Sequence, residues 1–134
     1  MNQSLRDYRL LPTPLFIIST TLKLDDSVPI LAPKSLRVVC DNMLQGLGRQ
    51  LRLCGVDVKI LGNHDDHDVA ARIAVEDDRV ILTCGKTFDR LKKFVSPGNC
   101  LSVEATQAKL QCVQVLQHFN VRVEKTDIFS RCQL

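Results

Sequence analysis

The chain has 134 residues, enough for one domain with its own core; 45% of them are hydrophobic and 25% are charged. These values are typical of globular proteins and exclude disordered and membrane compositions. The formal net charge of +3 favours a polyanionic partner only weakly. No apolar run reaches the roughly 18 residues that a membrane span requires, so we expect no membrane partner.

The cysteines and the first apolar stretch predict an intracellular protein, cytoplasmic or nuclear. Five cysteines lie in or beside apolar segments without metal-like pair spacing, which favours free thiols in a reducing compartment: Cys40, Cys54, Cys84, Cys100 and Cys112. The early stretch "LLPTPLFIIST" is broken by two prolines, and no small-residue cleavage site follows it. We therefore do not expect a signal peptide.

Residues 1–34 differ in composition from the rest of the chain. They contain four of the five prolines and show neither helical nor alternating periodicity. Because proline removes a backbone donor and biases the preceding residue away from helix, we predict an irregular N-terminal segment or linker here. The folded domain is expected over 35–134.

From residue 36 onward the hydrophobic period alternates between strand and helix. Strands are expected at 36–40, 56–61, 79–83 and 99–103, helices at 43–55, 66–78, 87–95 and 105–120, and a further strand at 121–124. In the longest helix, Leu110, Val113 and Leu116 are expected to face the core. The alternation predicts an α/β fold with a mostly parallel central sheet and helices on both faces.

Acidic residues follow three of the four main predicted strands. Asp41 comes after the first, Asp65, Asp66 and Asp68 after the second, and Glu104 after the fourth. Ligands of open α/β sheets bind at the carboxyl ends of the strands, and clustered carboxylates there suit a hard divalent ion. Aspartate is also a favoured helix cap, which is an alternative explanation for these residues.

Two other patterns near these strand ends are not assigned a chemical role. His64 and His67 lie beside the acids, but no third soft ligand is evident, which favours a solvated loop. The stretch "VILTCGKT" contains Gly85 and Lys86 in the order of a phosphate-binding loop, yet the required earlier glycine is replaced by Val80. A phosphate loop is therefore excluded.

Three segments in order resemble the Mut-seven C-terminal RNase family, whose domain has a PIN-like nuclease fold. They are "VVCDNMLQGLGRQLRLCGVDVKIL", "DDHDVAARIAVEDDRVILT" and "FNVRVEKTDIFSRC", and the resemblance covers about residues 36–132. It implies a PIN-like three-layer sandwich.

The resemblance also implies site residues. Asp41 matches the first acid of the family, and Asp66 matches the acidic turn together with its neighbours Asp65 and Asp68. The register does not decide which of these three is the ligand. Thr83 matches the threonine that ends the third strand.

The third acidic position of the family departs from the pattern. It falls on Gly85, which has no side chain to bind a metal. "TCGKT" therefore resembles a metal corner that has lost its acid. Asp89, about one helical turn later, is a candidate substitute or an exposed residue of the helix.

The function implied by the resemblance is hydrolysis of RNA phosphodiesters. Acids hold Mg²⁺ or Mn²⁺ in such enzymes, and here Asp41 and Asp66 would be the ligands. Loss of the acid at Gly85 is expected to weaken the reaction. The alternative is a catalytically inactive RNA-binding or protein-interaction module on the same fold.

Members of the family also carry a Cys-rich zinc ribbon, and the larger ones are fused to an exonuclease domain. In this sequence Cys132 stands alone near the end, where a paired knuckle would need a second cysteine. We expect no structural zinc in this chain. A missing exonuclease domain, or separate protein partners, would complete such a protein.

Basic residues near the acidic edge are candidates for contacts to a single-stranded RNA backbone. They are Arg49, Arg52, Lys86, Arg90, Lys92 and Lys93. Solvated helix faces explain the same pattern. With one Tyr, five Phe and no Trp, a platform for stacking bases is not predicted.

Overall fold

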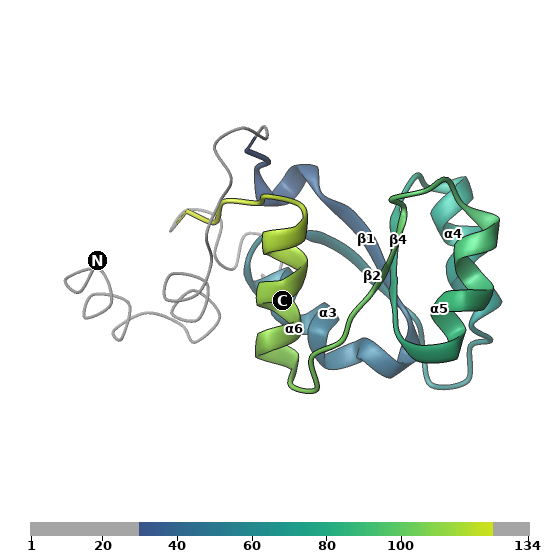
Figure 1. Ribbon diagram of the computed structural model, residues 1–134. Helices are drawn as coiled ribbons and strands as arrows, with labels where there is room; N and C mark the ends of the chain where they lie inside the picture. The colour runs from purple at the N-terminus through teal and green to yellow at the C-terminus, as the bar shows by residue number, and fades with distance from the viewer. Residues whose placement is uncertain (1–29, 125–134) are drawn as a thin grey trace.

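A computed structural model describes residues 30–124, and strands and helices alternate along them (Figure 1). The elements are β1 (Arg37–Cys40), α3 (Gln45–Leu53), β2 (Asp57–Ile60), α4 (Asp68–Glu76), β3 (Val80–Thr83), α5 (Gly85–Leu91), β4 (Cys100–Ser102) and α6 (Ala108–His118). Short 3-10 helices are η1 (Pro33–Ser35), η2 (Asn42–Leu44) and η3 (Lys92–Phe94). Cys132 and most of the predicted N-terminal segment lie outside the described residues.

The four strands form one parallel sheet in the order β2-β1-β3-β4. Cys40 at the end of β1 pairs with Ile60 of β2 and Leu82 of β3, and Thr83 pairs with Ser102 of β4. All four carboxyl ends therefore meet at one edge. The chain reverses its direction of travel across the sheet between β1 and β3, which is the usual ligand position in such folds.

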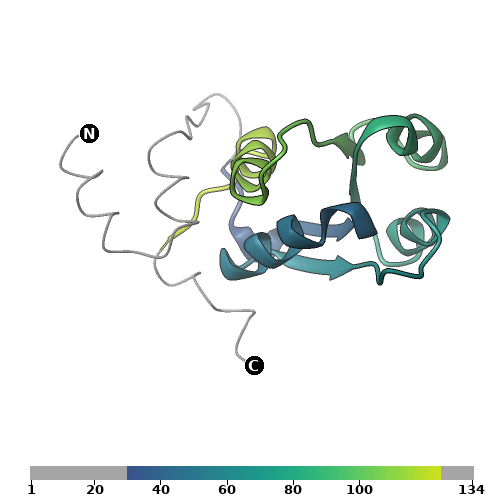
Figure 2. The ribbon, with the colours of Figure 1, turned by 90° about the horizontal axis from the view of Figure 1, so that it is seen from below.

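Helices cover both faces of the sheet, as predicted (Figure 1). Val38 belongs to a core with buried residues of α3 and α6, whereas the next residue, Val39, belongs to a second core with α4. Successive strand residues point to opposite faces, so one short strand supports two hydrophobic cores. In the view from below, α4 and α5 lie side by side, away from α6 (Figure 2). The result is a three-layer sandwich.

Helix α6 is rotated relative to the prediction. Its buried residues include Val113 and Leu116, as expected, but also Cys112 and Val115, whereas Leu110 is 46% exposed. The buried residues define a face centred between positions 112 and 116, and Leu110 lies beyond its edge in the first turn. The prediction for Leu110 was wrong.

None of the helices within residues 30–124 has the length and apolar character of a membrane span.

The expected strand at 121–124 is reduced to a single bridge. Val121 pairs in parallel with Leu31, and the amide of Arg122 donates to the Leu31 carbonyl at 3.0 Å. The partner segment turns at once into η1, which begins at Pro33 and cannot continue a ladder. Pairing therefore stops after one residue.

The five cysteines in the described part of the chain are free thiols, as predicted. Burial raises the pKa of Cys40 to about 12, so this thiol stays protonated at neutral pH. A hydrogen bond joins the thiols of Cys54 and Cys112. This contact, together with burial, raises the pKa of Cys112. These side chains act as small core residues.

A cluster of ion pairs ties the strands together at the opposite, amino-terminal edge. Arg79 is 7% exposed; its guanidinium contacts Asp77 at 2.7 Å and Asp57 at 3.0 Å. Arg37 and Lys59 also pair with Asp77, at 2.9 and 3.3 Å. The hydrogen bond from Arg79, followed by those from Lys59 and Arg37, lowers the pKa of Asp77 well below its ordinary value of 3.8.

This cluster predicts an acid-sensitive contribution to stability. Because the pKa of Asp77 is lower in the folded chain than in the unfolded one, its stabilising effect is complete above about pH 4 and is lost as pH falls further. Urea unfolding measured between about pH 5 and 2 should show a falling midpoint. Asp77→Asn should lower the midpoint at pH 7 and flatten this slope; an unchanged slope would contradict the assignment.

Close packing of α3 on β2 predicts a second effect. A Cβ atom at Gly48 would lie 2.6 Å from both Cγ1 and Cδ1 of Ile60. Gly48→Ala should therefore cost a net ~1–2 kcal/mol in urea unfolding, although alanine favours helix. In the Ile60→Ala background the same change should cost nothing further, because both clashing atoms are gone. Equal costs in the two backgrounds would exclude the clash.

Candidate functional site

The carboxylate of Asp41 lies at the centre of the carboxyl edge and is fully buried. Its Oδ1 accepts a 2.7 Å hydrogen bond from the Asn42 amide and lies 2.6 Å from Nδ1 of His67. Its Oδ2 accepts a 2.8 Å hydrogen bond from Oγ1 of Thr83. A buried carboxylate is tolerated only when it is hydrogen-bonded in this way.

Backbone geometry fixes these partners. Asp41 follows β1 directly, and its extended backbone lets the side chain cap η2 through the amide of Asn42. Thr83 ends β3, the neighbouring strand, and is also fully buried. The capping explanation for Asp41 is therefore confirmed, and the carboxylate also reaches a second strand and a loop.

His67 was expected to be a solvated loop residue, and that expectation was wrong. It precedes α4, and its ring contacts Asp41 while about a third of the side chain stays exposed. His64, in contrast, is exposed. The helix start brings His67 over the end of β1, a contact between residues 26 positions apart.

The acidic turn is held mainly by local hydrogen bonds. Asp65 accepts from the Gly62 amide at 2.7 Å, and Asp66 accepts from the Asp68 amide at 3.1 Å. Within residues 30–124 these carboxylates and Asp41 do not form a group of three that could hold a metal. Because the Asp68 amide is the first of α4, its hydrogen bond to Asp66 supports the helix-capping explanation in part. The Asp66 and Asp68 side chains are 71% and 58% exposed and pair with Arg90.

The ends of β3 and β4 add negative potential to the same edge. Glu104 follows β4 and accepts a 2.6 Å hydrogen bond from Ser102. The pKa of Cys84, which follows β3, is raised first by burial and then by the negative charges of Asp41 and Glu104. Both carboxylates are therefore near enough to Cys84 to act on its thiol.

Gly85 stands where the resemblance predicts a third acid. Its φ is +62°, a left-handed conformation that disfavours most side chains, and a Cβ atom there would meet nothing within 4 Å. Space for a side chain exists, but the backbone suits glycine. Asp89 pairs with Lys92 at 3.5 Å on the exposed side of α5.

The donor set does not fit a divalent ion as it is arranged. Among residues 30–124 no group of three His, Cys, Asp or Glu side chains is placed to hold a metal. Asp41 already uses three of the roughly four lone-pair sites of a carboxylate. An ion at Asp41 would have to displace His67 or Thr83.

The six predicted RNA contacts divide into two groups. Arg52 donates to the Val58 carbonyl at 3.0 Å and holds α3 against β2. Arg90 pairs with Asp68 at 3.1 Å, and Lys92 pairs with Asp89 and lies 5.2 Å from the Phe88 ring centroid. Arg49, Lys86 and Lys93 are exposed and have no ion-pair partner among residues 30–124.

Comparison with known proteins decides the family. The Mut7-C RNAse domain matches residues 36–134, which include all the strands and helices of the sandwich. This chain belongs to the Mut7-C RNAse domain family. The human exonuclease mut-7 homolog is 51% identical over 110 residues, which is 81% of this chain but 13% of that protein.

Membership of the Mut7-C RNAse family confirms the resemblance seen in the sequence. The match begins at residue 36, just before β1, so it contains Asp41, the acidic turn and Thr83. Since the chain spans only about 13% of the human relative's length, the activity of the longer protein does not transfer directly. The comparisons therefore establish the family of this domain and not the activity of the longer protein.

The hydrogen bonds of Asp41 predict a stability effect that separates structure from chemistry. Asp41→Ala leaves the buried hydroxyl of Thr83 without its acceptor and should cost about 1–3 kcal/mol in urea unfolding. Asp41→Asn should cost less, because an amide can donate to Thr83 while its oxygen accepts from Asn42. Thr83→Val, a near-isosteric change, should be coupled to Asp41→Ala. Additive costs would contradict the shared hydrogen bond.

Proposed function

We propose that this domain hydrolyses phosphodiester bonds of single-stranded RNA at the carboxyl edge of its sheet. The observation that carries the proposal is that Asp41 and Cys84 follow β1 and β3, between which the sheet order reverses, and that Glu104 follows β4 at the same edge, in a member of an RNase family. Fold alone would not support an activity, but the family and the position of the acids agree.

Lys86 and Arg49 are the groups that would bind the RNA backbone. Lys86 is the second residue of α5, directly beside the end of β3, and Arg49 lies on the exposed side of α3. Both are free of ion pairs within the described residues, so their charges are available to phosphates. They would hold the scissile phosphate at the acidic edge.

Hydrolysis requires removal of a proton from water and stabilisation of charge on the phosphate. Asp66 has an exposed carboxylate with one oxygen outside the local hydrogen bond to Asp68, and it is the proposed proton acceptor. Lys86 is the proposed partner of the phosphate oxygens. Asp41 holds His67 and Thr83 in place behind them.

A requirement for Mg²⁺ or Mn²⁺ remains a prediction of the family resemblance. Because Asp41 does not fit such an ion while it holds three donors, no step proposed here passes through one. If an ion is required, the Asp41 site must first open.

The second candidate is a domain that binds RNA without cleaving it. Two features favour it: Gly85 has no side chain where the resemblance predicts the third acid, and every oxygen of Asp41 is already hydrogen-bonded. Such a domain would need only its basic residues and would position RNA for another active site.

A cleavage assay with labelled single-stranded RNA separates the two candidates. With Mn²⁺ present, the wild-type chain should cleave, and Lys86→Ala and Asp41→Asn should each reduce the rate at least about tenfold through lost phosphate contact and a reorganised edge. Gly85→Asp should raise the rate, since space for the carboxylate exists and aspartate tolerates a positive φ better than most residues.

Asp78→Asn is the matched control. Asp78 is exposed at the opposite edge and has a positive φ of 51°, which asparagine accepts, so cleavage should not change. Binding without cleavage by the wild type, with cleavage appearing in Gly85→Asp, would establish the second candidate. Absence of both binding and cleavage would overturn both.

A further inference from the structure

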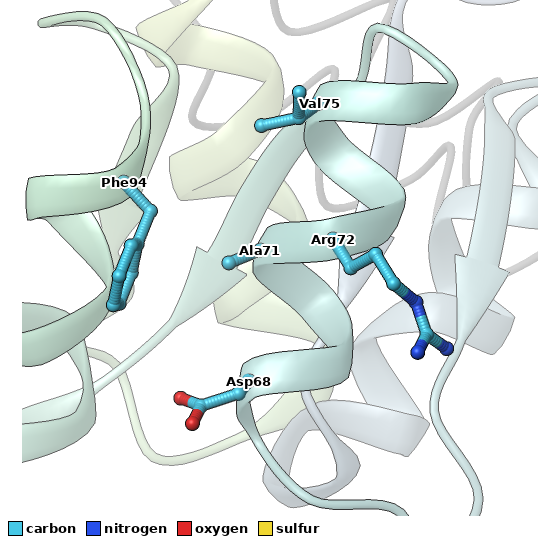
Figure 3. Close-up of a pocket in the computed structure, with 5 residues that line it drawn as sticks. All are labelled: Asp68, Ala71, Arg72, Val75 and Phe94. Carbon is cyan, nitrogen blue, oxygen red and sulfur yellow. The ribbon is translucent and has the colours of Figure 1, made fainter.

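A cleft of about 320 Å³ lies between α4 and η3. One wall carries Asp68, Ala71 and Val75, which follow one another along the same side of α4, and the opposite wall is the ring of Phe94 (Figure 3). Arg72 also borders the cleft, but its guanidinium points away from Phe94. The cleft is therefore apolar along its length with a carboxylate at one end.

The two large apolar side chains of this cleft are unusually exposed. Phe94 is 56% exposed and Val75 is 65% exposed, although they flank the same hollow. An exposed aromatic ring facing an apolar wall leaves a slot open to solvent, and such a pairing suggests a flat ligand. The volume exceeds that of a single nucleobase, which leaves room for part of the ribose.

Basic residues stand beside Phe94 in the sequence and next to Asp68 in space. Lys92 and Lys93 directly precede Phe94 in η3, and Lys93 has no ion-pair partner within the described residues. Arg90 reaches across and contacts Oδ1 of Asp68 at 3.1 Å. An exposed aromatic ring that follows an unpaired lysine in the sequence matches a base attached to a phosphate backbone better than it matches an uncharged peptide.

We propose that this cleft binds one unpaired base of single-stranded RNA, stacked on Phe94 against Ala71 and Val75. The proposal rests on the proposed function and names a binding site next to it. Asp68, the last acid of the acidic turn, begins α4, so this end of the cleft lies next to the carboxyl edge of the sheet. A base held here would place its own phosphate toward that edge.

Asp68 gives the cleft a preference among bases. Its Oδ1 pairs with Arg90, and Oδ2 has no partner within the described residues, so the carboxylate can accept one hydrogen bond. Exocyclic amino groups of guanine, adenine and cytosine can donate it. The only ring N–H of uracil lies between two carbonyl oxygens, which repel a carboxylate. The cleft therefore disfavours uracil.

The first test measures binding of short single-stranded RNA by fluorescence anisotropy. Phe94→Ala should weaken binding about tenfold, and Phe94→Leu, which keeps apolar area but cannot stack, should weaken it nearly as much. Lys93→Ala should reduce the slope of log affinity against log salt by about one, whereas Phe94→Ala should leave that slope unchanged. Because Phe94 is exposed, its replacement should not unfold the domain.

Leu110→Ala is the matched control, since it removes a comparably exposed apolar side chain from α6 on the other face. It should bind RNA like the wild type. RNA with abasic sites should bind the wild type and Phe94→Ala equally. Wild-type affinity of Phe94→Ala for intact RNA would overturn the proposal, and would leave a peptide as the occupant of the cleft.

Base preference gives a second test. The wild type should bind oligoadenylate more tightly than oligouridylate, and Asp68→Asn, whose amide can also donate to a carbonyl, should reduce that difference. A difference that persists unchanged in Asp68→Asn would contradict the role of this carboxylate.

A mononucleotide separates failure of this cleft from failure of the proposed hydrolysis. Titration of the chain with guanosine 5′-monophosphate, followed by NMR of the Phe94 ring, tests the cleft without any cleavage. Chemical-shift changes of the Phe94 ring, with none at the Leu110 side chain, would support binding in the cleft even if no RNA is cut. If the nucleotide causes no chemical-shift change at Phe94 of the wild type, and Phe94→Ala still cleaves RNA, the base-binding proposal is overturned and the hydrolysis proposal stands.

Discussion

The fold of this domain depends on satisfying one buried charge. Asp41 is fully enclosed at the end of β1, and a carboxylate in that position must receive hydrogen bonds from groups already in place. Its donors come from η2, from the start of α4 and from the end of β3. One side chain thereby links a central pair of strands to a helix on one face of the sheet.

The same contacts constrain the chemistry. Lone pairs of Asp41 that hold His67 and Thr83 are not available to a divalent ion, so stability and metal binding compete for one carboxylate. Gly85, where the resemblance predicts an acid, has no side chain to serve as a second ligand. At the opposite edge, Arg79 and Asp77 hold the strands with ion pairs whose role is structural alone. The two edges of the sheet thus use charge differently.

Much of the fold follows from local patterns. Apolar runs located all four strands, and the helical period of residues 43–55 located α3, whose Leu47 and Leu51 are buried, because both depend on periods within one segment. Leu110 shows the limit of this argument. Its spacing from Val113 is helical, but the neighbouring helix decides which part of α6 is covered.

By itself, the sequence determined the order of elements, the family and the acids that follow three of the four strands. Those features depend on short-range periodicity and on residue identity. Only the tertiary structure decided that His67 contacts Asp41, that Arg52 is used within the fold, and that Phe94 faces α4. Each of these contacts joins residues from different elements, and no local pattern records how two helices are placed across a sheet.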